Sequence, residues 1–451
     1  MKPVDPLVRK LQPWLARLLS SREVRQLRRH WFSRKEQGGA VLHVFLKLSD
    51  PYSYLLAQVL SDLQRRYRVT VRCYLVRQLP AAMFPEPELW QLNAVRDCQS
   101  LAALYGLRFE AADAFPASDR VDALEAELIA RADAGEDFLG QLPSRLEALW
   151  AGHAGTPSGI TPAQPLQVRE HMSRNEALLT QWGHYGSGMV YFGGEWYWGL
   201  DRLGHLEQRL LDEGRNRCPG MQVRYNRQER DFCLLGHADD LSEAARDLPL
   251  EMYFSIRSPY SYLGLEKAAQ LCHHYGLSLD VRPVLPMVMR GLRVPRSKTL
   301  YIFLDAKREA EKAGIPFGFT ADPLGAGVEC CYQLFDYARE QGRAVDYLLS
   351  VARGVYAEGV DISTRSGLRC VVERAGLDWA EARRQLGNTV WTEWAQKNLE
   401  DLYQQGFWGV PAFRYGDTRA WGQDRLWLIE RAIMQRSRDT TGEVGYQGVS
   451  C

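Results

Sequence analysis

One short stretch occurs twice in this chain, and this repeat constrains the fold more than any other feature. Residues 51–55 read Pro-Tyr-Ser-Tyr-Leu, and residues 259–263 read the same, 208 positions later. Two further matches follow in order: residues 106–109 with 314–317 at the same offset, and 198–203 with 421–426 at an offset of 223. Three matches in one order are hard to obtain by chance. We therefore predict a tandem duplication whose second copy has gained about fifteen residues.

The repeated stretch predicts a strand that ends where a helix begins. In the second copy an apolar run ends at Ile256, Ser258 is a preferred N-cap residue, and Pro259 suits the first helical position. The N–H groups and the dipole at a helix N-terminus favour negative charge. An anion or a thiolate could therefore be held beside Ser258.

Each copy predicts the same series of elements. The first contains a strand, a helix and a β-rich strand, which form a βαβ unit with parallel strands and a right-handed crossover. A helical region, a hairpin with a Gly-Gly turn and a closing helix follow. The predicted ranges are 40–48, 51–66, 69–77, 84–180, 189–198 and 202–211, and then 251–256, 259–275, 277–285, 296–402, 412–421 and 424–436. We predict an α/β chain of two tandem thioredoxin-like domains, each with an inserted helical subdomain.

Five segments are expected along the chain: a basic helical N-terminal extension at 1–38, a first domain at 39–215, a linker at 216–247, a second domain at 248–438 and a tail at 439–451. The extension has leucines on one face and arginines near its end. They are Leu7, Leu11, Leu15, Leu18, Arg22, Arg25, Arg28 and Arg29. We expect the leucine face to hold the extension on the first domain; contact with nucleic acid or an acidic membrane surface is the alternative.

Composition narrows the classes of function. The net charge of +1 and the 25% share of charged residues do not describe a nucleic-acid binder with a basic face. No run of about 18 apolar residues predicts a membrane span, and no signal peptide is recognisable, so a cytoplasmic protein without membrane contact is expected. The nine cysteines form no Cys-x-x-Cys pair, and the histidines are dispersed. We expect reduced core thiols, no dithiol redox centre and no metal site.

The second copy resembles a known family. The Ser258-Pro-Tyr-Ser-Tyr start, the Gly-Val-Pro turn at 409–411 and the Trp-Gly-Gln-Asp-Arg-Leu segment at 421–426 look like 2-hydroxychromene-2-carboxylate isomerases and kappa-class glutathione transferases. These belong to the DsbA-like thioredoxin superfamily. The resemblance covers residues 248–437 and, more weakly, 39–213.

The resemblance implies glutathione as co-substrate, with Ser258 as the catalytic residue that favours its thiolate. Val410, before a cis Pro411, would pair through its backbone with the cysteinyl part. Gln423 and Asp424 would hold the γ-glutamyl end, with Asp424 taking the ammonium. A substrate pocket would draw on Tyr260, Tyr262 and Trp421. One departure is Leu292, where kappa-class sequences have Asn before a Lys-Pro-Pro segment.

The first copy lacks most of these residues. It has Asp50 in place of Ser258, Gly188 in place of Pro411 and Leu200 in place of Gln423, and only Asp201 is kept. An ionised carboxylate beside a thiolate raises the thiol pKa instead of lowering it. We expect glutathione to be reactive only in the second copy, with the first copy, through Trp196, Tyr197 and Trp198, covering that site or forming a subunit contact.

Each proposed residue also has a structural interpretation. Ser258 is a helix cap in any case, a cis proline is a structural device of the thioredoxin fold, and Tyr260 and Tyr262 suit an amphipathic core. Three functions stay open: a glutathione-dependent isomerase or transferase for a small aromatic electrophile, a thiol-disulfide oxidoreductase, and a non-catalytic binding protein. The expected partner is a small molecule, and self-association into a homodimer stays open.

Overall fold

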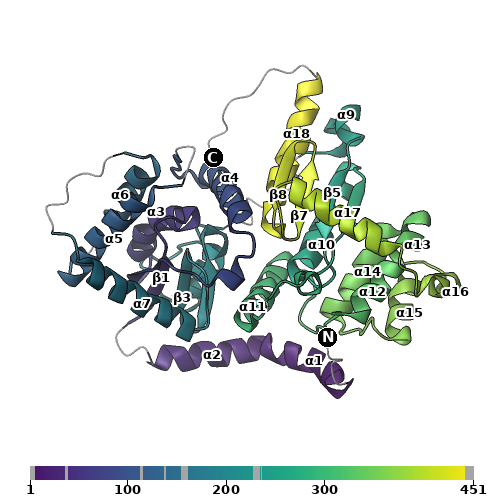
Figure 1. The fold of residues 1–451 in the computed structure, drawn as a ribbon, viewed down its shortest axis with the longest axis horizontal. Helices are drawn as coiled ribbons and strands as arrows, with labels where there is room; N and C mark the ends of the chain where they lie inside the picture. Colours follow the sequence, from purple (N-terminus) through teal and green to yellow (C-terminus); the bar gives the residue numbers. More distant parts are fainter. Residues whose placement is uncertain are drawn as a thin grey trace. The chain divides into compact units, whose positions relative to one another are not determined.

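The computed structural model describes residues 6–35, 39–111, 115–136, 139–153, 161–226, 234 and 236–441. The chain divides into two compact units, one made of Arg25–Gln228 with Pro295–Tyr301, and the other of Met1–Val24, Glu229–Val294 and Ile302–Cys451. Each unit contains one four-stranded sheet, so the chain is a mixed α/β protein (Figure 1).

The first sheet has the strand order β2-β1-β3-β4. Strands β1 (Val41–Leu46) and β2 (Thr70–Leu75) are parallel and are joined by α3 (Pro51–Arg66), whereas β3 (Met189–Phe192) and β4 (Glu195–Trp198) form an antiparallel hairpin. The helices between β2 and β3 are α4 (Pro87–Tyr105), α5 (Ser118–Asp133), α6 (Leu142–Trp150) and α7 (Pro165–Gln181), and the unit continues into η2 (Leu200–Arg202) and α8 (Leu203–Asp212).

The second sheet has the order β6-β5-β7-β8. Strands β5 (Leu250–Phe254) and β6 (Leu279–Pro283) are parallel and are joined by α10 (Pro259–Tyr275), and β7 (Ala412–Tyr415) and β8 (Thr418–Trp421) form the hairpin. Between β6 and β7 lie η5 (Met287–Arg290), α11 (Arg296–Ala313), α12 (Ala326–Gln333), α13 (Phe335–Glu340), α14 (Ala344–Ala357), α15 (Arg365–Arg374), α16 (Trp379–Ala382), η6 (Arg383–Gln385) and α17 (Trp391–Gln404); η7 (Gln423–Arg425) and α18 (Leu426–Thr441) follow.

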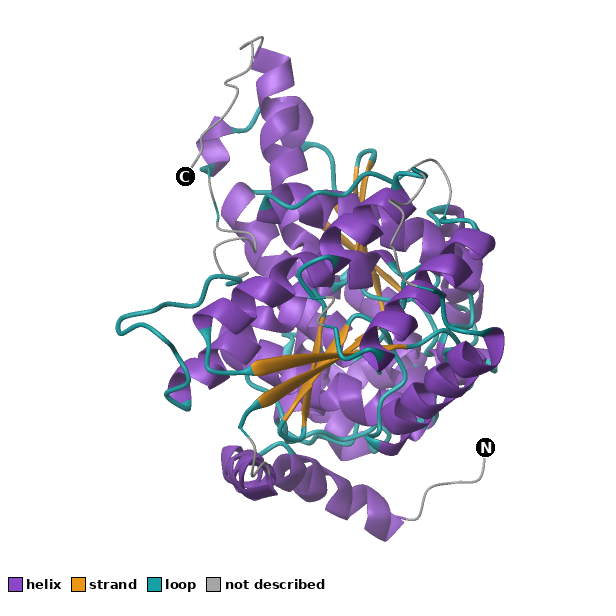
Figure 2. Cartoon of the chain, turned by 90° about the vertical axis from the view of Figure 1, so that its left-hand side faces the viewer, coloured by secondary structure: helices purple, strands orange, loops and turns teal. Residues whose placement is uncertain are grey.

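Both faces of each sheet are covered by helices (Figure 2). Along β5, Met252 and Phe254 point into the core that α10 and α18 complete, whereas Tyr253 points into a smaller cluster with Leu402 of α17. This alternation follows from the two-residue period of a strand. Because every inward position of β5 is apolar, its register is fixed by burial on both sides.

The helix starts follow local sequence chemistry. Helices α3 and α10 begin at Pro51 and Pro259, directly after Asp50 and Ser258, whose side chains accept main-chain N–H groups of the first turn. The expected segment 216–247 is less irregular than the sequence suggested, since it contains η4 (Ala238–Asp240) and α9 (Glu243–Arg246). Within it, Tyr225 is buried in the core of the first sheet.

The N-terminal extension consists of two helices, α1 (Pro6–Leu19) and α2 (Arg22–Lys35). The prediction that its leucine face packs on the first domain is wrong for α1, because Leu11, Leu15 and Leu18 are exposed. Helix α1 contacts the second unit through other residues, including Arg9, whose guanidinium donates to the Ser363 hydroxyl at 2.5 Å. Among the described helices, none has a stretch long and apolar enough to cross a bilayer.

Candidate functional site

Ser258 lies at the point where the second sheet meets the N-terminus of α10. Its hydroxyl oxygen accepts the Ser261 N–H at 3.1 Å and its hydroxyl donates to the Val410 carbonyl at 3.4 Å. The side chain is only partly buried. A hydroxyl at the positive end of a 17-residue helix is suited to stabilise an anion placed beside it.

The residues predicted to bind a peptide backbone lie around this hydroxyl. The Val410-Pro411 peptide bond is cis, as predicted from the Gly-Val-Pro turn. The Pro411 carbonyl accepts the Gly422 N–H at 2.9 Å, which brings the start of η7, with Gln423 and Asp424, next to the same turn. The structure therefore collects Ser258, Val410, Pro411, Gln423 and Asp424 in one region.

The side chain of Gln423, however, points inward. Its amide oxygen accepts from the Lys267 ammonium at 2.7 Å, and its amide nitrogen donates to Glu309 at 2.9 Å and to the carboxylate of Asp424. All four side chains are buried. A buried cation and two buried carboxylates need such partners, so this amide is already occupied. The geometry does not favour a ligand contact from the Gln423 side chain.

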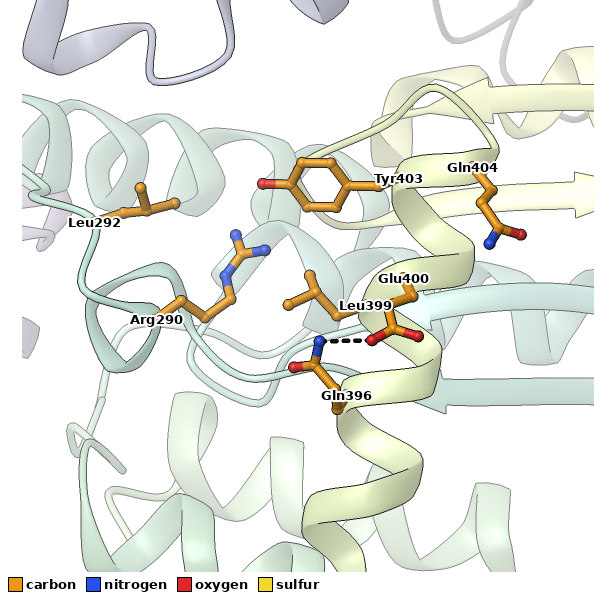
Figure 3. A pocket seen from close by; sticks show the side chains of 7 residues that line it. All are labelled: Arg290, Leu292, Gln396, Leu399, Glu400, Tyr403 and Gln404. Atoms are coloured by element: carbon orange, nitrogen blue, oxygen red, sulfur yellow. Dashed lines mark hydrogen bonds between the residues drawn. The ribbon is translucent and has the colours of Figure 1, made fainter.

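A pocket of about 460 Å³ opens beside this region, between the loop at η5 and one face of α17 (Figure 3). Its lining residues are Arg290, Leu292, Gln396, Leu399, Glu400, Tyr403 and Gln404. The Arg290 side chain and the Tyr403 ring extend toward the same opening from opposite walls, and Gln396 donates to Glu400 at 2.8 Å. The volume suits a small organic ligand.

Two contacts link the pocket to the cis-proline turn. Arg290 donates to the Trp408 carbonyl at 3.1 Å, two residues before Val410. Leu399 packs in the same cluster as Val410 and Trp421. Arg290 and Leu399 therefore connect the pocket wall to the turn that accepts the Ser258 hydroxyl, and the residues that line the pocket come from the η5 loop and α17.

Of the pocket residues, only Leu292 was indicated by the sequence. The pocket residues of α17 recur at positions 396, 399, 400, 403 and 404, which is the spacing of one helix face. Apart from Leu399, the side chains on that face are polar. In the sequence, such a face cannot be told from a helix face that is simply exposed to solvent. Arg290 carried no sequence signal, since its neighbours form a short 3-10 turn.

The three residues expected to line a substrate pocket have different positions. Tyr262 is fully buried and its hydroxyl donates to the Pro316 carbonyl at 3.0 Å, so it is a core residue, not a pocket residue. Tyr260 is partly buried and donates to Asp305 at 2.6 Å. Trp421 packs against Trp408 with ring centroids 4.4 Å apart, over Gly409, where an added Cβ would lie 3.2 Å from the indole.

In the first unit the corresponding position is filled by the protein itself. Asp50 is buried, and its carboxylate accepts from the Tyr52 and Ser53 N–H groups at 3.2 Å and from the hydroxyls of Ser53 and Ser187 at 2.7 and 2.8 Å. Burial raises the pKa of Asp50, while these hydrogen bonds favour its ionised form. The carboxyl group is thus satisfied internally and is closed to solvent.

Gly188 closes the same region from the other side. It has φ +64°, and a Cβ added there would lie 3.4 Å from the Asp50 carboxylate, so a side chain at this position would be in contact with Asp50. Leu200 and Asp201 are also buried. Of the three aromatic residues expected at a surface contact, Trp196 and Tyr197 are buried as well, and only Trp198 is partly exposed.

The described cysteines, Cys73, Cys98, Cys218, Cys272, Cys330, Cys331 and Cys370, are all free thiols. Burial raises the pKa of Cys272 and of Cys331 to about 12, which suppresses their thiolates at neutral pH. Cys233 and Cys451 lie outside the described residues.

Known proteins are similar in sequence to the second unit of this chain. Residues 249–434 match the family model of the DsbA-like thioredoxin domain. A 2-hydroxychromene-2-carboxylate isomerase of Pseudomonas putida is 27% identical over 192 residues, which are 41% of this chain and 93% of the relative. The enzyme of the same name from Sphingobium xenophagum is 25% identical over 193 residues, 41% of this chain and 97% of the relative. A solved 2-hydroxychromene-2-carboxylate isomerase structure aligns with TM-score 0.39 and 25% identity, over 44% of this chain and 100% of that one.

Proposed function

We propose that the DsbA-like thioredoxin domain at residues 249–434 is a glutathione-dependent isomerase or transferase for a small aromatic electrophile, similar in reaction to the 2-hydroxychromene-2-carboxylate isomerases that it resembles. The observation that carries this proposal is the partly exposed Ser258 hydroxyl at the N-terminus of α10, in contact with the Val410 carbonyl. The comparisons support the family, and the polar geometry at Ser258 supports a thiolate as the group held there.

Bound glutathione would supply a thiolate nucleophile that adds reversibly to a conjugated double bond. The protein's part is electrostatic. A hydroxyl donor and the helix N-terminus lower a thiol pKa, which populates the thiolate near neutral pH. Ser258 would turn its hydroxyl from the Val410 carbonyl, at 3.4 Å, to the sulfur. Val410 would then offer its main chain to the cysteinyl part. Asp424, whose buried carboxylate accepts from the Gln423 amide, would have to turn outward to take the ammonium.

The pocket between the η5 loop and α17 would hold the electrophile. Leu292 and Leu399 provide apolar walls for an aromatic ring, and Arg290 and Tyr403 provide donors for a carboxylate or carbonyl oxygen. Holding the electrophile beside the thiolate converts a bimolecular encounter into a local one. For an isomerase the bond to sulfur forms, the electron pair moves onto the conjugated oxygen, the freed carbon-carbon bond rotates, and the pair returns as the thiolate leaves.

We also propose that the chain is a tandem duplication of this fold. Besides the shared strand order, hydrogen bonds recur at corresponding positions. Tyr52 donates to Asp97 at 2.8 Å and Tyr260 donates to Asp305 at 2.6 Å, both partners being 208 positions apart. Three more hydrogen bonds recur with both partners shifted by 208 or 223 positions. Tyr67 donates to Glu207 as Tyr275 does to Glu430, and Asn175 donates to the Leu75 carbonyl as Asn398 does to the Pro283 carbonyl. The Gly199 N–H donates to the Gly188 carbonyl as the Gly422 N–H does to the Pro411 carbonyl.

On this proposal the first unit is a copy without thiol chemistry. Asp50 takes the place of Ser258, and the hydroxyl of Ser187, which occupies the position of Val410, is bonded to it at 2.8 Å. A thiolate would meet a buried carboxyl group there, and a side chain added at Gly188 would contact the same carboxylate. The first unit is then retained for its structure or its surface.

Two other functions predict different behaviour. A thiol-disulfide oxidoreductase needs a cysteine at or beside Ser258, and the sequence has none there. A non-catalytic binding protein is favoured by one observation, Leu292 in the pocket wall, where the resemblance leads one to expect an asparagine.

The test combines binding and turnover. The full chain should be retained on immobilised glutathione and should convert 2-hydroxychromene-2-carboxylate, followed by absorbance, only when glutathione is added. Ser258→Ala should lose the conversion and keep its fold by circular dichroism. Retention without any conversion would favour a binding protein, and conversion independent of glutathione would contradict the proposed chemistry.

A further inference from the structure

Helix α1 is oriented with its apolar face toward solvent. Leu11, Trp14, Leu15, Leu18 and Leu19 each keep between 50% and 60% of their surface exposed. The spacing of the first four places them on one face of the helix. Single exposed leucines are common on protein surfaces, but a contiguous apolar face of this kind marks a binding surface.

The opposite face of α1 makes the contacts with the protein. Pro13 and Ser20 are buried, and Gly359 approaches Pro13 so closely that a Cβ there would lie 2.9 Å from the Pro13 ring. Arg9 donates to the Ser363 hydroxyl at 2.5 Å and lies 3.9 Å from the Asp361 carboxylate. Trp14, at the edge of the apolar face, also packs its ring on Phe319 with the ring centroids 5.0 Å apart. Helix α1 is therefore held in place by its small and polar face and by this edge, and the four leucines of the apolar face stay outward.

Basic side chains border the exposed face. Lys10 and Arg17 are seven residues, or about two helical turns, apart and lie next to Trp14 on the helix surface. Arg22 follows at the start of α2, and the side chains of Lys10, Arg17 and Arg22 are exposed. Residues 1–35 contain ten Lys and Arg against two Asp and Glu, a net charge of +8, although the whole chain carries only +1. The positive charge of the protein is thus concentrated at these two helices, and residues 36–451 carry −7.

We propose that α1 is a docking helix for an anionic lipid surface. Leucines at the centre of the face, a tryptophan at its edge and cations beside it match the interfacial helix, which buries its apolar face at the level of the lipid headgroups while its cations meet anionic phosphates. The charge complementarity favours this occupant. A nucleic acid would require basic residues at the centre of the face, where this helix has leucines.

The inference is independent of the proposed isomerase activity. It concerns α1 alone, and none of its face residues contacts Ser258 or lines the pocket beside α17. Leu27 and Trp31 of α2 are exposed as well, and they provide a second, smaller apolar pair four residues apart. Docking would bring the protein to a membrane, where hydrophobic aromatic compounds partition.

The test is flotation of the full chain with vesicles of phosphatidylcholine containing about 25% phosphatidylglycerol, and with vesicles of phosphatidylcholine alone. We expect binding to the anionic vesicles, a marked loss when salt is raised from about 0.1 to about 0.5 M, and a loss of at least about ten-fold in the vesicle partition coefficient for Leu15→Glu/Leu18→Glu. Lys10→Gln/Arg17→Gln should weaken binding to the anionic vesicles only.

The matched control is Leu92→Glu/Leu166→Glu, which changes two leucines of similar exposure on other helices and should bind as the parent does. Circular dichroism checks that each variant is folded. Parent protein that stays unbound at low salt, or binding that survives the Leu15/Leu18 change, overturns the proposal. The proposal is also overturned if, without vesicles, the parent protein is a dimer and the Leu15→Glu/Leu18→Glu variant is a monomer. The apolar face would then join two copies of the chain.

Discussion

The Ser258 hydroxyl donates to the main-chain carbonyl of Val410, 152 residues further along the chain, at 3.4 Å. The contact joins the start of α10 to the turn before β7, and both elements are anchored on β5 or its neighbour. A bond of this length is near the limit of a useful hydrogen bond, so the hydroxyl is held in place without being strongly engaged. A stronger acceptor, such as a thiolate, would take over this donor at little cost.

Ser258→Ala should abolish thiol activation and lower the free energy of unfolding by about 0.5 to 2 kcal/mol, the usual effect of losing an N-cap. The two effects have separate causes, since the cap bond from Ser261 N–H serves the helix and the hydroxyl donor serves the sulfur. Thiolate absorbance of the glutathione complex near neutral pH measures the first effect, and urea denaturation measures the second.

Thr364→Ala is the matched control. Thr364 caps α15 by accepting the Gly367 N–H at 3.1 Å, so its loss should cost a similar amount of stability without changing the thiolate absorbance. If Ser258→Ala behaves like Thr364→Ala in both measurements, Ser258 is a helix cap and nothing more.

Arg290→Ala should raise the KM for an aromatic carboxylate substrate by about ten-fold, which corresponds to about 1.4 kcal/mol, with a smaller effect on kcat. The guanidinium extends toward the pocket and holds the Trp408 carbonyl at 3.1 Å, so its removal takes away both a donor and a support of the turn. Steady-state kinetics of the purified chain give both constants. Arg339→Ala, an exposed arginine on α13, controls for the loss of one positive charge, and an unchanged KM in Arg290→Ala would remove the pocket from the substrate site.

Asp50→Asn should change how stability depends on pH. Because burial raises the folded-state pKa of Asp50 above its ordinary value of 3.8, the folded state binds the proton more tightly than the unfolded state does. The stabilisation is complete below pH 3.8 and is lost as pH rises through the folded-state pKa. The free energy of unfolding of Asp50→Asn relative to the parent should therefore increase with pH over this window, by denaturant titration at several pH values.

Asp378→Asn changes another aspartate that caps a helix, but an exposed one, and serves as the control for the substitution itself. If the free energies of unfolding of Asp50→Asn and the parent differ by the same amount at all pH values, the pKa of Asp50 is the same in the folded and unfolded states, which would contradict the prediction. The offset at any single pH is not diagnostic, because the Asn amide cannot accept every hydrogen bond that the carboxylate accepts.

Local chemistry in the sequence was enough to predict the elements that present the site. Ser-Pro and Asp-Pro steps set the starts of α10 and α3, the Gly-Gly turn set the β3-β4 hairpin, and the Gly-Val-Pro turn indicated the cis bond at Pro411. These signals involve neighbouring residues and fixed backbone preferences, so they do not depend on the rest of the fold.

What the sequence did not reveal depends on tertiary packing. The inward turn of the Gln423 side chain follows from Lys267 and Glu309, which come from α10 and α11 and are far apart in the sequence. The pocket arises because the η5 loop meets α17, more than a hundred residues later. In the sequence, the leucine face of α1 has the pattern of a helix face that packs into a core. The burial of Pro13 and Ser20 in the structure shows that the opposite face packs against the protein.

The two units should differ in ligand binding, and calorimetry should give one glutathione per chain. The second unit offers a partly exposed hydroxyl at Ser258, whereas the first offers a buried Asp50 whose oxygens already accept four hydrogen bonds. Asp424→Ala should therefore remove binding, and Asp201→Ala should leave it unchanged.

The comparison is well matched, since Asp424 and Asp201 are both buried and both lie in the short helix that follows the hairpin of their unit. Each substitution removes one buried carboxylate, so any general loss of stability should be similar, and thermal melts of the two variants would verify this. Two equivalent sites per chain would contradict the prediction of a single site in the second unit. Binding that is lost in Asp201→Ala and kept in Asp424→Ala would place the glutathione site in the first unit instead. One site with the predicted sensitivity would place it at the end of α10 that Ser258 caps.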